Sequence, residues 1–262
     1  MFLHSNQVIE KMQKGDIVLI TGGSSGVGLQ LAKELTQKGC KVLICGRTIE
    51  KLQQAQKEIP EIDIFQCDLS KIKDCNDLCN QIISKYPGLN ILINNAAIVN
   101  KIDFRTDEFA LPKAVEEFNI NIMAPIRLIK ILLPVIEKNK RSQIVNISTG
   151  LVYAPREIYP FYNATKAALH SFTQVLRMQL SKSSPTTITE VLLPVVDTPW
   201  HNGNPPKMAI PVDKAVSEMI SKLEKGQTEI RVGKVELLHW LSRIAPQFAI
   251  KMLNNATSRK QQ

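Results

Sequence analysis

The feature that most constrains the fold is a regular alternation of short apolar runs with longer segments of helical periodicity. The apolar runs predict buried strands at residues 16–21, 41–45, 62–66, 90–94, 143–148, 187–193 and 229–232. Helices are predicted between them at residues 28–38, 48–58, 70–86, 112–139, 161–181 and 212–224. Strands that are apolar along their whole length are typical of a parallel sheet covered on both faces. The pattern therefore predicts an α/β fold with a doubly wound parallel sheet of about seven strands and helices on both faces.

Length and composition fit one compact unit. The chain has 262 residues, 44% of them hydrophobic, which suffices for a core without a disulfide or metal staple. With 12 glycines and 14 prolines it is neither fibrous nor disordered. No linker or repeat interrupts the alternation, so we expect a single domain over residues 1–262. Pro125 lies inside the long predicted helix, where we expect a kink.

The formal net charge of +9 raises the question of an anionic partner. A nucleic-acid surface needs clustered basic residues with stacking aromatics, but aromatics are 5% of the chain and the basic residues are spread through every helix. We therefore expect no nucleic-acid partner. The charge fits an anionic cofactor, and an anionic or carrier-bound substrate.

The amino terminus lacks the basic start and unbroken apolar run of a secretory signal, and no segment approaches the roughly 18 apolar residues of a membrane span. The five cysteines are an odd number, and Cys75 and Cys79 have no histidine nearby. Reduced thiols rather than a metal site follow from that pattern. We expect a cytoplasmic protein with no transmembrane span and no metal.

A glycine-rich turn follows the first predicted strand. A loop between a strand and a helix must turn sharply and let its backbone approach a phosphate, which favours residues without Cβ. The helix amino terminus then offers free N–H groups to a pyrophosphate. The turn predicts a dinucleotide site formed by Gly22, Ser24, Ser25, Gly26, Val27 and Gly28.

Three motifs in order resemble the short-chain dehydrogenase/reductase family. They are Thr21-Gly-x-x-x-Gly-x-Gly28, Asn94-Asn-Ala-Ala97 and Tyr162-x-x-x-Lys166, and the likeness covers residues 16–198. The resemblance implies a Rossmann-type fold, a nicotinamide cofactor bound in part by Asn95, Ala96 and Ala97, and a homodimer or homotetramer formed through the helices after strands four and five. Within the family, the chain is similar to a small bacterial group typified by DltE.

The residues after the second strand select the cofactor. A carboxylate there would bind the adenosine ribose of NAD and repel a 2′-phosphate, whereas an arginine binds that phosphate. The chain has no acid at this position but has Arg47, so we expect NADP (NADPH) in preference to NAD. Asp68 and Leu69 match the family's adenine-side residues, although Asp68 equally suits a cap for the next helix.

A proton donor is required when a hydride moves to a carbonyl. Tyr162 and Lys166 are four apart on a predicted helix and share one face. The resemblance implies that Tyr162 is the general acid/base, and that Lys166 lowers its pKa and binds the nicotinamide ribose. It implies a water-ordering role for Asn121.

The family's substrate-binding serine falls on Thr149, one residue after Ser148. Side chains alternate along a strand, so only one of the two hydroxyls can face the site, and we favour Thr149. After strand six, Pro194 stands where the family has glycine, with Val196 and Thr198 expected beside the nicotinamide.

Two further segments each fit more than one role. Trp200 lies in the loop where the family places a substrate lid, and it fits either a pocket wall or simple packing. The tail at residues 235–253 is amphipathic and fits packing on the core or on another subunit, a lid, or interfacial membrane contact.

The sequence as a whole predicts an NADP-dependent oxidoreductase that acts on a small-molecule carbonyl or secondary alcohol. The alternatives are a 3-oxoacyl thioester reductase with a carrier-bound substrate, and a nucleotide-binding regulator without catalysis.

Overall fold

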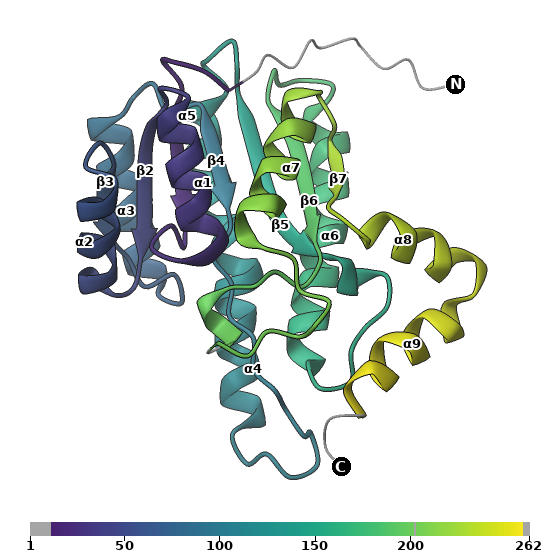
Figure 1. Ribbon diagram of the computed structural model, residues 1–262. Helices are drawn as coiled ribbons and strands as arrows, with labels where there is room; N and C mark the ends of the chain where they lie inside the picture. The colour runs from purple at the N-terminus through teal and green to yellow at the C-terminus, as the bar shows by residue number, and fades with distance from the viewer. Residues whose placement is uncertain (1–11, 202, 259–262) are drawn as a thin grey trace.

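The computed structural model describes residues 12–201 and 203–258 and is built on one parallel sheet in the order β3-β2-β1-β4-β5-β6-β7 (Figure 1). Its strands are β1 (Ile17–Thr21), β2 (Lys41–Gly46), β3 (Asp63–Gln66), β4 (Ile91–Asn94), β5 (Gln143–Thr149), β6 (Thr187–Leu193) and β7 (Glu229–Arg231). The order reverses between β1 and β4, which is where such sheets bind ligands. The predicted doubly wound parallel sheet is confirmed.

Helices cover both faces because each strand sends apolar side chains to both sides. In β1, Val18 and Ile20 belong to one core cluster and Leu19 to the other. The first cluster packs under α1 (Gly26–Gln37), α2 (Ile49–Glu58) and α7 (Val212–Glu224). The second packs under α3 (Ile72–Lys85), α5 (Ala124–Ile136) and α6 (Pro160–Leu180).

The long predicted helix is interrupted. It begins as α4 (Ala110–Phe118), continues through a π-helical turn at η1 (Asn119–Met123), and resumes as α5. Pro125 has no N–H to give to the carbonyl four residues back, and a π-turn accommodates such a break. The expected disturbance therefore lies directly before Pro125.

Among the residues that the structure describes, Ala110–Ile136 is long and apolar enough to cross a membrane by length and composition. This finding corrects the expectation that no segment approaches a span. About half of its most apolar stretch, 56%, is buried inside the protein, and Leu128 and Leu132 pack in the core beneath the sheet. A buried core helix passes the same test, so the finding is weak evidence for a membrane span.

The five cysteines are all free and buried. In the described ranges, 12–201 and 203–258, no group of three or more His, Cys, Asp or Glu side chains could hold a metal ion.

The tail forms two helices, where one amphipathic segment was predicted. They are α8 (Val235–Ile244) and α9 (Pro246–Ser258), with the break at Ala245 because a residue before proline is disfavoured in a helix. Figure 1 shows them as an elbow beside β7, in which α8 leads away from the sheet and α9 turns back below it. Two short 3-10 turns, η2 (Gly150–Val152) and η3 (Pro199–His201), complete the described elements.

The close approach of α1 to the first strand generates a stability prediction. A Cβ on Gly28 would lie 2.3 Å from the Gly22 carbonyl oxygen and 2.6 Å from Nδ2 of Asn95. Gly28→Ala should therefore destabilise the fold by about 1–3 kcal/mol, which at this chain length lowers the melting temperature by roughly 2–10 °C. Gly88→Ala is the control, because its Cβ would meet only Ile17 at 3.4 Å. Equal melting temperatures for the two variants would contradict this account of the turn.

Candidate active site

The glycine-rich turn lies between β1 and α1 and has the backbone geometry of a phosphate cradle. Gly22 and Gly26 adopt φ values of +65° and +52°, which side chains with a Cβ rarely tolerate. The N-cap residue of α1, Ser25, makes no side-chain hydrogen bond to the helix. The first N–H groups of α1 are thus not capped by that side chain and fit an anionic group. The turn therefore fits the pyrophosphate of a dinucleotide.

Thr21 and Asn95 join the turn to the end of β4. The Thr21 hydroxyl accepts from the backbone N–H groups of Asn95 at 2.9 Å and Ala96 at 3.0 Å. The Asn95 amide donates back to the carbonyls of Thr21 at 2.9 Å and Gly22 at 3.3 Å. These bonds hold the ends of β1 and β4 together, and Ala97 follows on the surface. The Asn95 side chain is therefore engaged with the protein backbone.

Arg47 lies just after β2, as the sequence predicts, and its side chain is 65% exposed. Its guanidinium is 3.5 Å from Oε1 of Glu116 on α4. An exposed ion pair of this length contributes little free energy, so Arg47 is available to another anion.

Asp68 closes a turn and does not cap a helix. Its carboxylate accepts from the backbone N–H of Ser70 at 3.1 Å and from the Ser70 hydroxyl at 2.7 Å, whereas the N-cap of α3 is Lys71. Burial would raise the pKa of Asp68, but the Ser70 hydrogen bonds and the Lys71 and Arg47 charges lower it overall. The helix-capping role considered for Asp68 is therefore wrong, and its side chain stabilises the turn before α3 instead. The neighbouring Leu69 is buried.

Asn121 is fully buried in the π-turn. Its Nδ2 donates to the Ile98 carbonyl at 2.8 Å and to the Thr165 hydroxyl at 3.1 Å, and its Oδ1 accepts from the Ile98 N–H at 2.9 Å. The side chain thus anchors the segment after β4 to α6.

Of the two candidate hydroxyls on β5, the one that faces Tyr162 is that of Thr149. Thr149 accepts from the Leu151 N–H at 3.3 Å, and its side-chain hydrogen bond with Tyr162 lowers the pKa of the tyrosine. Ser148 is buried, and its hydroxyl has no hydrogen-bond partner among the described residues. The alternation of side chains along β5 accounts for this difference.

Tyr162 lies in the first turns of α6 and is half-buried. Its pKa is raised well above the usual value, first by burial and then by the charge of Glu117. The direction is opposite to the predicted lowering by Lys166. A phenol with a raised pKa is protonated near neutrality, which is the form that can donate a proton.

Lys166 is 3% exposed and lies one turn after Tyr162. Its Nζ donates to the Ile147 carbonyl at 2.8 Å and lies 5.8 Å from the centre of the Tyr162 ring. Burial lowers the pKa of Lys166 to about 8, while the charge of Glu190 acts in the opposite direction. The ammonium is therefore held close to the tyrosine by a backbone carbonyl.

The segment after β6 crosses the glycine-rich turn. A Cβ on Gly26 would lie 3.3 Å from Cγ2 of Thr198, so the two segments are in close proximity. Val196 forms a β-bridge with Ile210, and Pro194 is half-buried. This arrangement brings the loop expected at the nicotinamide next to the phosphate cradle.

An aromatic row leads from the lid segment to Tyr162. The Trp200 ring is 6.1 Å from that of Tyr159, which is 6.4 Å from that of Tyr162. Trp200 is 45% exposed, so its contacts with the row leave part of the ring open. The row favours the pocket-wall interpretation of Trp200.

Sequence reasoning missed two buried carboxylates near the candidate catalytic pair. Glu117 is fully buried and its Oε1 accepts from the N–H and side-chain amide of Asn100, both at 2.9 Å. Glu190 is also fully buried, on β6. Only Glu190 had a signal, since a charged residue inside an otherwise apolar strand is unusual.

Comparison with known proteins finds relatives over most of the chain. A sequence profile of the short chain dehydrogenase family matches residues 16–208. The chain is 38% identical over 231 residues to the uncharacterized oxidoreductase DltE of Bacillus subtilis, covering 86% of this chain and 91% of that protein. It is 34% identical over 197 residues to a fatty acyl-CoA reductase of Acinetobacter baylyi, covering 71% of this chain and 64% of that protein.

Solved structures show the same fold. A short chain dehydrogenase from Burkholderia cenocepacia in complex with NADP superposes with a TM-score of 0.80 at 22% identity, covering 93% of this chain and 98% of that one. One from Burkholderia phymatum in complex with NAD has a TM-score of 0.79 at 16% identity, covering 93% and 97%. The profile match and the 38% identity to an oxidoreductase establish that the chain is an NAD(P)-dependent oxidoreductase and belongs to the short-chain dehydrogenase/reductase family.

Proposed function

We propose that this oxidoreductase transfers a hydride between NADP(H) and a carbonyl or secondary alcohol, with Tyr162 as the general acid/base. The observation that carries the proposal is the grouping of Tyr162, Lys166 and Thr149, from α6 and β5, at the carboxyl edge of the sheet. Bound NADPH supplies the hydride. The protein must then orient the carbonyl oxygen and give it a proton.

Each side chain has a distinct role in this scheme. The Thr149 hydroxyl orients the substrate oxygen, and the Tyr162 hydroxyl donates the proton. Lys166, as an ammonium, stabilises negative charge that develops on the tyrosine oxygen and binds the nicotinamide ribose. Asn121 orders the proton path from the π-turn, and Ser148, the alternative hydroxyl on β5, is assigned no step. Because the Tyr162 phenol is protonated near neutrality, it can give its proton to the substrate oxygen.

The cofactor would lie along the carboxyl edge of the sheet. The cradle of Gly22, Ser24, Ser25, Gly26, Val27 and Gly28 would hold the pyrophosphate. Asp68, Leu69 and the segment Asn95–Ala96–Ala97 would flank the adenine and ribose, and Pro194, Val196 and Thr198 the nicotinamide. Arg47 supports NADP over NAD, because a guanidinium binds a phosphate in two hydrogen bonds and no acid follows β2 to repel it.

A second candidate is reduction of an acyl thioester. The aromatic row from Trp200 to Tyr162 offers an apolar wall to a long substrate. One relative is named a fatty acyl-CoA reductase. A nucleotide-binding regulator without catalysis is the third interpretation, and the intact Tyr162 and Lys166 argue against it.

A homo-oligomer is part of the proposal. Helices α4 and α6 expose large apolar side chains, namely Leu111, Val115, Val175 and Met178. Exposed apolar patches on helices mark protein contacts, and these are the helices expected to form the dimer. We also propose a cytoplasmic location and a single domain over the chain.

The cofactor preference can be tested by titrating NADPH and NADH into the protein. Wild type should bind NADPH at least about tenfold more tightly, since one charge-assisted phosphate pair contributes about 1.5–3 kcal/mol. Arg47→Asp should remove most of that difference. Lys57→Asp, on the exposed end of α2, makes the same charge change elsewhere and should preserve it. Equal wild-type affinities would reject the NADP preference.

The proton-donor role can be tested with Tyr162→Phe, assayed on a panel of carbonyls and thioesters by nicotinamide absorbance. Turnover should fall by at least about a hundredfold, because general acid catalysis contributes that much, while NADPH affinity stays close to that of wild type. Tyr159→Phe removes a neighbouring hydroxyl and should cost far less. Substantial turnover by Tyr162→Phe would show that another group donates the proton.

A further inference from the structure

The proposed mechanism leaves a buried carboxylate without a role. Glu190 is 0% exposed in the middle of β6, and its Oε2 lies 2.7 Å from Nδ1 of His170. Its Oε1 has no hydrogen-bond partner among the described residues. Burying a charge is costly unless nearby charges compensate it. The carboxylate therefore needs cationic neighbours.

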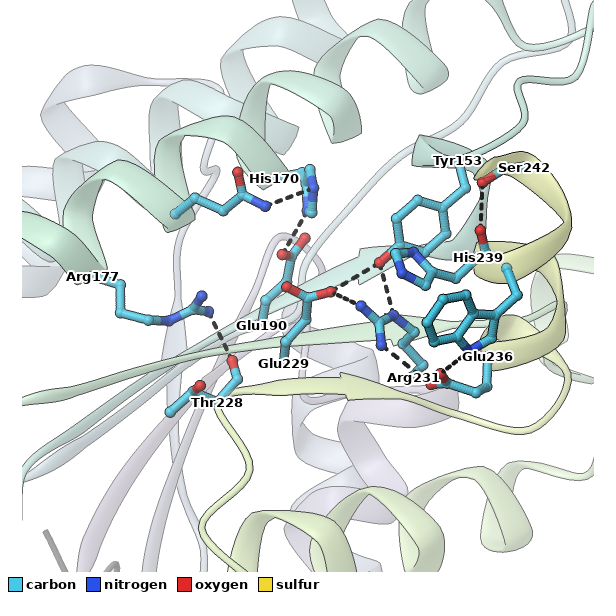
Figure 2. A network of polar contacts seen from close by, with 12 residues as sticks. Tyr153, His170, Arg177, Glu190, Thr228, Glu229, Arg231, Glu236, His239 and Ser242 are labelled. Atoms are coloured by element: carbon cyan, nitrogen blue, oxygen red, sulfur yellow. Dashed lines mark hydrogen bonds and ion pairs between the residues drawn. The ribbon is translucent and has the colours of Figure 1, made fainter. Parts of the chain in front are cut away.

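The strand register raises the free-energy cost of burying the Glu190 charge. Glu190 pairs directly with Glu229 on β7, which places two carboxylates on one face of adjacent strands. Glu229 has its own permanent cation, Arg231, and also accepts from the Tyr153 hydroxyl at 3.0 Å. Figure 2 shows the two carboxylates beside each other, with His170 next to one and Arg231 next to the other. Glu190 thus faces a titratable imidazole where Glu229 faces a guanidinium.

The helix above supplies the missing cation. Tyr162, Lys166 and His170 are spaced four apart along α6 and form one stripe. Lys166 binds the Ile147 carbonyl, and Ile147 pairs in register with Val191, the neighbour of Glu190. This register places Glu190 below the stripe, within electrostatic reach of both the lysine and the histidine.

Burial and the nearby Glu190 charge act on the pKa of Lys166 in opposite directions. Burial alone lowers the pKa of Lys166, and the Glu190 carboxylate opposes that shift, leaving it at about 8. Arg177, further along α6, donates to the carbonyls of Ile188 at 2.8 Å and Thr228 at 2.7 Å and also faces both carboxylates. The hydrogen bond to Glu190 raises the pKa of His170.

We propose that Glu190, oriented by His170, is a positioning residue that holds Lys166 in its ammonium form beneath Tyr162. The inference rests on the proposed function for its catalytic meaning, because a neutral lysine could not stabilise the tyrosinate. Below the pKa of His170, the imidazolium offsets part of the Glu190 charge. Above it, the full charge acts on Lys166, in the range where the lysine would otherwise lose its proton.

The test is a direct titration of Lys166 in the full-length protein. Lysine labelled with ¹³C at the ε carbon reports protonation by its chemical shift, and Lys166→Arg identifies the signal. Glu190→Gln should lower the midpoint of Lys166 by about one pH unit, because it removes the opposite charge that favours the ammonium form. The matched control is Glu229→Gln, which removes the neighbouring carboxylate on β7 and should shift Lys166 much less.

Unchanged Lys166 midpoints in Glu190→Gln, or equal shifts in the two variants, would overturn the inference. If glutamine prevents folding, Glu190→Met removes the charge at similar volume without a buried amide, and the same shift is expected. Glu190→Asp retains the charge and should restore most of the wild-type midpoint, which a purely structural role would not do.

Kinetics separates this inference from the proposed function. With an active carbonyl substrate, the alkaline fall of kcat/KM should move to lower pH in Glu190→Gln, together with the Lys166 midpoint. If the wild-type protein neither binds NADPH nor reduces a carbonyl, the proposed function fails. The lysine titration would still decide whether Glu190 controls Lys166.

Discussion

The structure depends on the close approach of the first turn of α1 to the end of β1. Gly28 packs so tightly against the Gly22 carbonyl that no Cβ fits, and the Asn95 amide contacts the same carbonyl. This contact fixes the angle at which α1 leaves the sheet and directs its amino terminus at the switch point between β1 and β4. The Thr21 hydroxyl accepts from the chain after β4, so the cradle is tied directly to the next segment of the site.

The reaction geometry is built on a second constraint, which is electrostatic. Lys166 and Thr149 are buried and Tyr162 is half-buried at the carboxyl edge of the sheet, where an uncompensated charge is costly. Two groups compensate the charge of Lys166. Its ammonium donates to the Ile147 carbonyl, and the negative charge of Glu190 favours its protonated form. Tyr162, flanked by Glu117, stays protonated. The tyrosine thus has a proton to give to the substrate oxygen, and the Lys166 ammonium lies close enough to stabilise the negative charge left on the tyrosine.

Most of the fold could be predicted because apolar strands and amphipathic helices alternate with clear glycine and proline boundaries. The position of Tyr162 relative to Lys166 followed from helical spacing alone. Three features could not be derived in this way. The sequence indicates a disturbance at Pro125 but not its π-helical form at Asn119–Met123, and it indicates a proline after Ala245 but not that the tail divides there into two helices. The buried pairing of Glu190 with His170 depends on how α6 packs on β6, which local patterns do not encode.

The most direct measurement of the central claim is a crystal structure of the chain with NADP bound. The account predicts the 2′-phosphate at Arg47, the pyrophosphate at the glycine-rich turn, and the nicotinamide ribose against Lys166, with the Tyr162 hydroxyl facing the reactive carbon. A complex in which Tyr162 points away from the nicotinamide, or in which the nucleotide lies elsewhere on the sheet, would contradict it.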